Sequence, residues 1–387
     1  MIRTMHVHKK KIGRALAAVL LLAMLFGLTG ACRAEMVNLN ASGTPNRKAA
    51  VDLTRGSEGY SAVLYNNTNG LPTSEANAIA ETSEGFIWIG SYSGLIRYDG
   101  NTFERMDSTG GLTSIKCLYV DSRDRLWIGT NDNGAAVMDR GEIRTWNKLN
   151  GMKSAHTRAI TEDQNGTIYV ATAFGITMID PDGTLSSLDD PAVAEADMRD
   201  LRMGNDGIIY GTTDSGDLVM IRDGSLLRFI STDDNPFNGV GAILPDPKEA
   251  GKIYLEVADF GFYHIDLNDG FTVLEKIDIS PLTYLRQMEF IDGKIWICAT
   301  NGIGVLDNGS FYLLENLPMN NNVCRVMTDY LGNLWFASSR QGVMKVVPNQ
   351  FSDFSRRFGL PEIVVNSTCM SDGMLFAATD NGLIVLD

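Results

Sequence analysis

The chain has 387 residues, of which 47 are acidic and 33 basic, giving a formal net charge of −14. Nucleic-acid-binding proteins need a basic stripe that replaces the counterions of the phosphates, so this composition argues against that class. The five cysteines form no CxxC motif and no metal-like spacing with the four histidines. We therefore predict no nucleic-acid partner, no metal and no cofactor.

Residues 1–34 have the pattern of an export signal. They contain six basic and no acidic residues, and 15–32 is an uncharged run rich in Leu and Ala. Three outcomes stay open: simple cleavage, lipidation of Cys32, or retention as an anchor, because such a run sits at the lower limit for a bilayer span. We predict an exported protein, periplasmic or extracellular, that meets the membrane only through this segment.

The next residues, 35–59, are polar and irregular and are predicted to form a linker. Residues 60–66 follow as a single β-strand that precedes the first repeat. Cys117, Cys298, Cys324 and Cys369 lie in or beside apolar strands. We expect them to act as small buried hydrophobes, with a disulfide between blades as the alternative in an oxidising compartment.

A segment of about 41 residues then repeats along the chain. Each copy holds an aromatic anchor inside a β-rich run and a glycine six or seven residues later. The anchors are Trp88, Trp127, Tyr169, Tyr210, Tyr254, Trp296, Trp335 and Phe376. Such a period, with short strands broken by Gly, Asn and Asp, is typical of a β-propeller and not of helical repeats. We predict an all-β propeller of four-stranded blades.

The second copy shows how one repeat forms a blade. Four runs, 114–121, 125–130, 135–139 and 142–146, form a meander whose faces are buried only when blades stack. The anchor Trp127 is expected to fill the wedge between two blades. The first turn begins with an aspartate that is expected to cap its own backbone.

The repeats predict a seven-bladed propeller over 60–350 and a partial eighth repeat over 351–387. The last copy has three strands. Two closures are open: the strand at 60–66 completes blade seven, and 351–387 starts a second propeller, or the same strand completes an eight-bladed ring. We favour seven blades, because Gly-Leu-Pro at 70–72 and at 359–361 suggests two ring starts.

Several stretches resemble the two-component regulator propeller repeat. They are Gly-Leu-Pro at 70–72, Asn-Ala-Ile-Ala-Glu at 77–81, Gly-Phe-Ile-Trp-Ile-Gly at 85–90, Gly-Leu-Ile-Arg-Tyr-Asp-Gly at 94–100, Leu-Trp-Ile-Gly-Thr at 126–130 and Gly-Asn-Leu-Trp at 332–335. The resemblance spans 60–387 and is weak in repeats four and five. It implies an exported propeller that senses a ligand and signals to a histidine kinase or a diguanylate cyclase. Many such sensors of gut bacteria respond to products of carbohydrate breakdown.

No kinase, receiver or cyclase sequence follows the repeats, so the sequence predicts the sensor portion without an output domain. In a propeller the turns between strands two and three crowd one face around the axis, where a small polar ligand such as a carbohydrate can bind. The candidate ligand-binding residues are Tyr92, Asp132, Phe174, Asp214, Phe260, Asn301 and Arg340.

Two other functions compete with ligand sensing. A protein-interaction scaffold is compatible with every feature of the sequence. A propeller enzyme similar to streptogramin lyase would need an acid and a base that converge on the axis; the candidates are His156 and His264, and His264 is expected to be buried in a third strand. We predict no enzymatic activity, a small polar ligand, and a second copy or a signalling protein as partner.

Overall fold

The structure is a computed structural model that describes residues 49, 51, 53, 59–106, 112–235, 237, 239–257, 261–349 and 363–386. The predicted export segment with Cys32 lies outside these residues, and so does Phe260. Within the described ranges, no helix has the length and apolar character needed to cross a bilayer.

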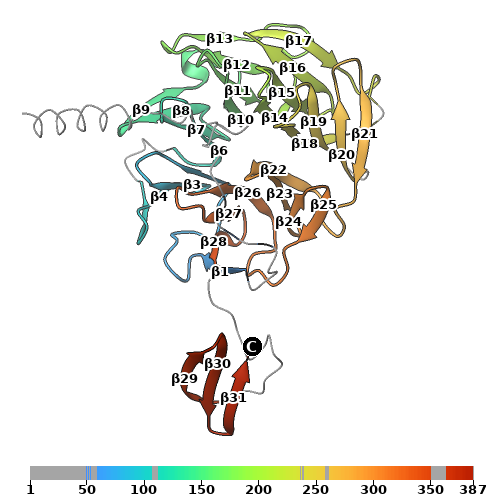
Figure 1. Ribbon diagram of the computed structural model, residues 1–387. Coiled ribbons are helices and arrows are strands. Elements are labelled where there is room, and N and C mark those ends of the chain that lie inside the picture. The colour runs from blue at the N-terminus through green and yellow to red at the C-terminus, as the bar shows by residue number, and fades with distance from the viewer. Residues whose placement is uncertain are drawn as a thin grey trace, which may run out of the picture. The chain divides into compact units, whose positions relative to one another are not determined.

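Six antiparallel sheets each hold four consecutive strands, and a seventh recruits its fourth strand from the start of the described chain (Figure 1). Blade one is β2 (Ala78–Glu81), β3 (Ile87–Ser91), β4 (Gly94–Tyr98) and β5 (Phe103–Arg105). Blade two is β6 (Ile115–Val120), β7 (Leu126–Thr130), β8 (Ala135–Asp139) and β9 (Glu142–Trp146). Blade three is β10 (Thr157–Glu162), β11 (Ile168–Thr172), β12 (Ile176–Ile179) and β13 (Leu185–Ser187). The short 3₁₀ helix η2 (Lys148–Asn150) lies between blades two and three.

The remaining blades repeat this plan. Blade four is β14 (Met198–Met203), β15 (Ile209–Thr213), β16 (Leu218–Arg222) and β17 (Ser225–Ile230). Blade five is β18 (Val240–Pro245), β19 (Lys252–Val257), β20 (Gly261–Asp266) and β21 (Thr272–Ile277). Blade six is β22 (Leu285–Ile291), β23 (Lys294–Ala299), β24 (Gly302–Asp307) and β25 (Ser310–Leu313). Blade seven is β26 (Val323–Thr328), β27 (Leu334–Ser338), β28 (Gly342–Pro348) and β1 (Tyr60–Tyr65).

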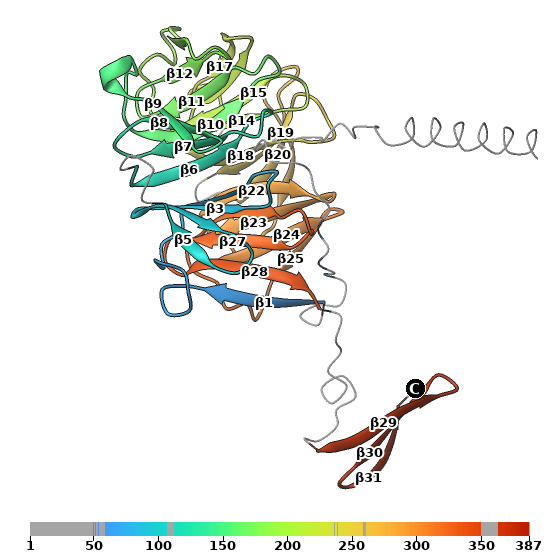
Figure 2. The ribbon, with the colours of Figure 1, turned by 90° about the vertical axis from the view of Figure 1, so that its left-hand side faces the viewer.

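Strand β1 closes the ring. It pairs antiparallel with β28 over six residue pairs, from Tyr60 opposite Pro348 to Tyr65 opposite Val343 (Figure 2). The innermost strands β2, β6, β10, β14, β18, β22 and β26 contact one another in turn, and β26 contacts β2 again. Seven blades thus form a closed ring, the first of the two closures open from the sequence, and pairing with β1 covers the edge that β28 would otherwise expose.

Seven of the eight predicted aromatic anchors lie between neighbouring blades, and the eighth, Phe376, lies in the three-stranded sheet of the partial repeat. Seven hydrophobic clusters each combine residues of two adjacent blades. Trp88 lies between blades one and two, Trp127 between two and three, Trp296 between six and seven, and Trp335 between seven and one. All four indoles are at most 5% exposed. Each therefore removes about 150–250 Å² from water, which favours stacking of the blades.

The first turn of a blade also supports its anchor. Asp121 Oδ1 accepts the backbone N–H groups of Arg123 (3.0 Å) and Arg125 (2.9 Å), which confirms the predicted capping of the turn. Its Oδ2 accepts the indole Nε1–H of Trp127 at 2.8 Å. Asp329 holds Trp335 in the same way at 2.9 Å. One carboxylate thus orders the turn and satisfies the polar atom of a buried ring.

The last described strands, β29 (Val365–Ser371), β30 (Met374–Thr379) and β31 (Gly382–Leu386), pair with one another in a three-stranded sheet. Its apolar side chains are open to solvent: Met370 is 67% and Leu383 64% exposed. A single blade buries its faces only against neighbours, so this exposure is expected for the partial eighth repeat.

Two details differ from expectation. Within the stretch predicted as a linker, Val51 is buried and Leu53 packs against the cluster between blades six and seven. The described cysteines are free; Cys117 and Cys298 are buried as predicted, and Cys324 is half-buried. The prediction of burial is wrong for Cys369, which is exposed because the sheet of β29 has open faces.

Candidate functional site

One face of the ring carries both the turns between second and third strands and the connections between blades; we call it the turn face. Backbone hydrogen bonds tie the two together. The Ser114 N–H, just before β6, donates to the Tyr92 carbonyl at 2.9 Å, and the Asp214 N–H donates to the Asp197 carbonyl, just before β14, at 2.8 Å. The second-to-third-strand turns therefore lie against the starts of the innermost strands.

Six predicted ligand-binding residues lie in these turns: Tyr92, Asp132, Phe174, Asp214, Asn301 and Arg340. All six are exposed, with Tyr92 at 50% and Phe174 at 43%. Each belongs to a different blade, so the structure spreads them around the turn face and does not gather them into one cluster. The seventh, Phe260, lies outside the described residues.

Asn301 has a structural role in its turn. Its Oδ1 accepts the Thr283 N–H at 2.8 Å, and its Nδ2 donates to the Pro281 carbonyl at 2.7 Å. Both functional ends of the side chain therefore hold the connection that leads to β22. Within the described residues, the rings of Tyr92 and Phe174 form no hydrogen bond or ring contact.

A ring of bulged residues marks the mouth of the central channel. In six blades the pairing between first and second strands shifts near the second residue of the innermost strand. A bulge leaves a residue unpaired and re-aims its side chain. The residues at this position, with the equivalent residue of blade one, are Asn77, Lys116, Arg158, Arg199, Gly241, Arg286 and Cys324. We call these seven residues the mouth ring, and four of them are cationic.

In blade five a second strand supplies the side chain that Gly241 lacks. A Cβ at Gly241 would lie 1.6 Å from Oε2 of Glu256, so the carboxylate occupies this place in the mouth ring. Glu256 accepts the Ala242 N–H at 3.2 Å and the Leu285 N–H at 2.8 Å. The carboxylate is thereby fixed between blades five and six.

The charges at the mouth act on one another. Burial raises the pKa of Glu256, against the effect first of its two backbone hydrogen bonds and then of the charges of Arg199 and Arg286. Burial lowers the pKa of Lys116, and the charge of Arg325 lowers it further. Lys116 stays accessible to water, as expected for a group that lines a channel. Perturbed titratable groups that converge in this way mark a candidate functional site.

Partners are few among the mouth-ring cations. Arg158 lies 3.4 Å from Asp197, with both side chains partly exposed. Arg286 donates to the neutral Asn322 Oδ1 at 3.2 Å. Arg199 has no hydrogen bond or ion pair within the described part of the chain. Among the described residues, the four cations thus outnumber the two carboxylates that act on them, Asp197 and Glu256.

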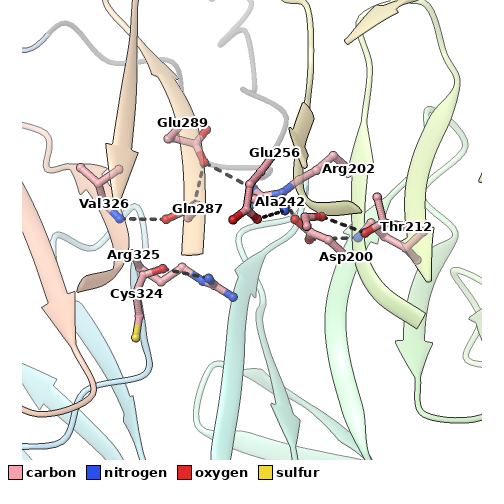
Figure 3. A network of polar contacts seen from close by, with 12 residues as sticks. Asp200, Arg202, Thr212, Ala242, Glu256, Gln287, Glu289, Cys324, Arg325 and Val326 are labelled. Carbon is pink, nitrogen blue, oxygen red and sulfur yellow. Dashed lines mark hydrogen bonds and ion pairs between the residues drawn. The ribbon is translucent and has the colours of Figure 1, made fainter. Parts of the chain in front are cut away.

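Deeper in the channel, a buried network joins blades that are not neighbours (Figure 3). Arg202 of blade four lies 3.4 Å from Asp200 and 3.4 Å from Glu289 of blade six. Gln287 donates to Glu289 at 3.0 Å and accepts the Val326 N–H of blade seven at 2.9 Å. A cavity of about 50 Å³ remains among the innermost strands. This volume holds a few water molecules and excludes a ligand of sugar size.

A larger cavity of about 610 Å³ opens on the turn face between blades five and six. Glu256 lies in its wall, together with Asp278, Thr283 and Tyr284. Tyr284 is 62% exposed and has a φ of 51°, a conformation that bulky residues rarely adopt. The volume is within the range of small-molecule sites.

The two histidines considered for catalysis do not meet at the mouth. His264 Nε2 lies 2.9 Å from Asp246 Oδ2, and its ring stacks on Tyr254 with centroids 4.4 Å apart. The side chain is 14% exposed and thus half-buried, so the predicted burial is met only in part. His156 is exposed in the connection before β10.

Seven four-stranded sheets, closed by an N-terminal strand around a blocked channel, define a seven-bladed β-propeller. The two-component regulator propeller model matches residues 70–93 and 110–132, in agreement with the predicted resemblance of these repeats. No curated protein matches the chain significantly.

Among solved structures, three similar ones show the range of the fold. The extracellular domain of the putative hybrid two component system BT3049 from B. thetaiotaomicron is 21% identical, with a TM-score of 0.63, and 85% of this chain covers 48% of that one. Streptogramin B lyase is 16% identical, with a TM-score of 0.62, and the match covers 75% of this chain and 98% of the lyase. The third is PorZ of Porphyromonas gingivalis, a surface component of the type-IX secretion system. It is 15% identical, with a TM-score of 0.59, and the match covers 82% of this chain and 52% of PorZ. At these identities the likeness is one of fold alone, and this chain spans about half the length of the first and third.

Proposed function

We propose that this chain is the exported sensing portion of a bacterial signal-transduction protein and that it binds a small polar ligand, such as a carbohydrate, on the turn face. One observation carries the proposal: the second-to-third-strand turns and the under-neutralised mouth ring meet on one face above a blocked channel. Such convergence of polar groups from many blades suits a ligand site.

Export and signalling rest on the sequence. The basic and then apolar pattern of residues 1–34 supports export, and the family of the repeat supports a role in two-component signalling. The signalling partner, which can be a second copy of the chain or a separate output protein, belongs to this proposal. We further propose that the chain binds its ligand without chemical conversion.

The test is calorimetric titration of the full chain with a panel of oligosaccharides. The panel contains acidic members, each paired with its carboxyl-reduced or desulfated neutral counterpart. We expect at least one member to bind. A loss of roughly 3- to 10-fold in Tyr92→Ala or in Phe174→Ala, the value of one aromatic contact, would place the ligand over blade one or blade three, and no loss in either would place it over another sector of the turn face. Tyr330→Ala is the control, because Tyr330 is 63% exposed in a first-to-second-strand turn, away from the turn face. Failure of every member to bind would remove the sensing proposal and favour a protein-interaction scaffold.

A further inference from the structure

The mouth ring concentrates positive charge in a strongly acidic chain. Lys116, Arg158, Arg199 and Arg286 come from four different blades and occupy the same bulged position. Like charges that converge on one channel repel one another and weaken the closed ring. Arg158 pairs with Asp197 and Arg286 donates to Asn322, whereas Lys116 and Arg199 have no such partner within the described residues, as expected for cations of a binding site.

Around Glu256, charges from three adjacent blades act on one another. Arg199 of blade four and Arg286 of blade six both act on this carboxylate, which itself stands in blade five. Both oxygens of Glu256 already accept backbone N–H groups. Both guanidinium groups are exposed to solvent, and within the described residues neither forms an ion pair with a carboxylate.

The cavity between blades five and six continues outward from this sector, because Glu256 lines both. Its wall adds the hydroxyl group of Thr283, the carboxylate of Asp278 and the exposed ring of Tyr284. Hydroxyl and carboxylate groups pair with sugar hydroxyls, and an exposed aromatic face packs on the C–H groups of a pyranose. Ser114 and Asn322 have the same positive φ directly before β6 and β26, so this conformation belongs to the connection between blades, and in blade six it carries an aromatic ring at the cavity.

We propose that the ligand is an acidic saccharide whose carboxylate or sulfate binds between Arg199 and Arg286 while its sugar ring lies on Tyr284. Guanidinium groups suit this role because they form paired, charge-assisted hydrogen bonds with oxyanions. The Arg202–Glu289 pair blocks the channel below, so the saccharide lies across the mouth and does not enter the channel. This inference rests on the proposed function and specifies the chemical class of its ligand.

The test compares matched acidic and neutral oligosaccharides by calorimetric titration of the full chain, with inorganic sulfate as a separate probe. We expect each acidic binder to bind at least about tenfold more tightly than its neutral counterpart, since charge-assisted contacts exceed neutral ones by this order. Arg199→Gln combined with Arg286→Gln should abolish this preference. The control is Arg123→Gln combined with Arg140→Gln, which removes the same charge from turns away from the turn face.

Tyr284→Asn separates the two parts of the site. Asn tolerates a positive φ, so the turn is retained while the ring is lost. We expect weaker binding of acidic saccharides and unchanged binding of inorganic sulfate. Binding of neutral members with equal strength would overturn this inference and leave the proposed function intact, whereas no binding by any member would overturn both. A response to sulfate alone, or equal loss in the control variant, would also overturn the inference.

Discussion

Gly342 provides a test of the ring closure, because it begins β28 beside the closing strand β1. Its φ of 89° lies in the left-handed region, and a Cβ there would lie 2.1 Å from the carbonyl oxygen of Tyr65. Backbone strain of an alanine in this region costs about 1–3 kcal/mol, and displacement of β1 adds a similar amount. We therefore expect Gly342→Ala to lower the free energy of unfolding by roughly 2–6 kcal/mol.

Gly309 offers a matched control. Its φ is 79°, and a Cβ there would meet no atom within 4 Å, so Gly309→Ala carries the backbone strain without the clash. Urea unfolding and amide hydrogen exchange would be measured for both variants. We expect faster exchange across residues 60–65 only in Gly342→Ala. Equal destabilisation, together with unchanged exchange of β1, would refute closure through this strand.

Two further changes test the anchors and the mouth. Trp127→Phe should lower the unfolding free energy by about 1–2 kcal/mol more than Trp296→Phe. The reason is that the indole N–H of Trp127 donates to Asp121, whereas that of Trp296 has no partner within the described residues. Equal losses of unfolding free energy in urea would contradict this. Lys116→Gln should raise the urea midpoint at pH 7, because burial and then Arg325 lower the lysine pKa. A lowered lysine pKa costs stability in full below the lowered value, and the cost disappears as the pH rises to the ordinary value of about 10.4. The gain should therefore shrink at pH 10, and a constant gain would exclude this cause.

The blades could be predicted from the sequence because their packing is local. An aromatic such as Trp127 recurs with a period of about 41 residues, and each copy buries it against the next in the same way. The bonds from Asp121 to its own turn were predictable from the spacing alone. The hydrogen bond from the indole of Trp127 to Asp121 was not predictable, because it depends on the pairing register of the strands that carry these residues.

The mouth ring had a signal in the sequence that was not recognised. Lys116, Arg158 and Arg199 each stand eleven residues before the aromatic anchor of their blade. In a strand such positions read as solvent-facing, and only the bulge and the closed ring bring them to one channel. Glu256 gave no signal, because its place in the ring depends on the missing side chain of Gly241.

The channel holds two groups of charges, the deep pair of Arg202 with its carboxylates and the cations of the mouth ring, and they differ in burial and in pairing. Arg202 is 6% exposed and lies between two carboxylates, so removing either side would leave a buried charge uncompensated. Arg199 is the second residue of the same strand, three residues before Arg202, yet it is exposed and forms no hydrogen bond or ion pair within the described residues. Stability accounts for the deep pair and not for the cation at the mouth. The cations at the mouth are therefore the charges that the proposed ligand would use.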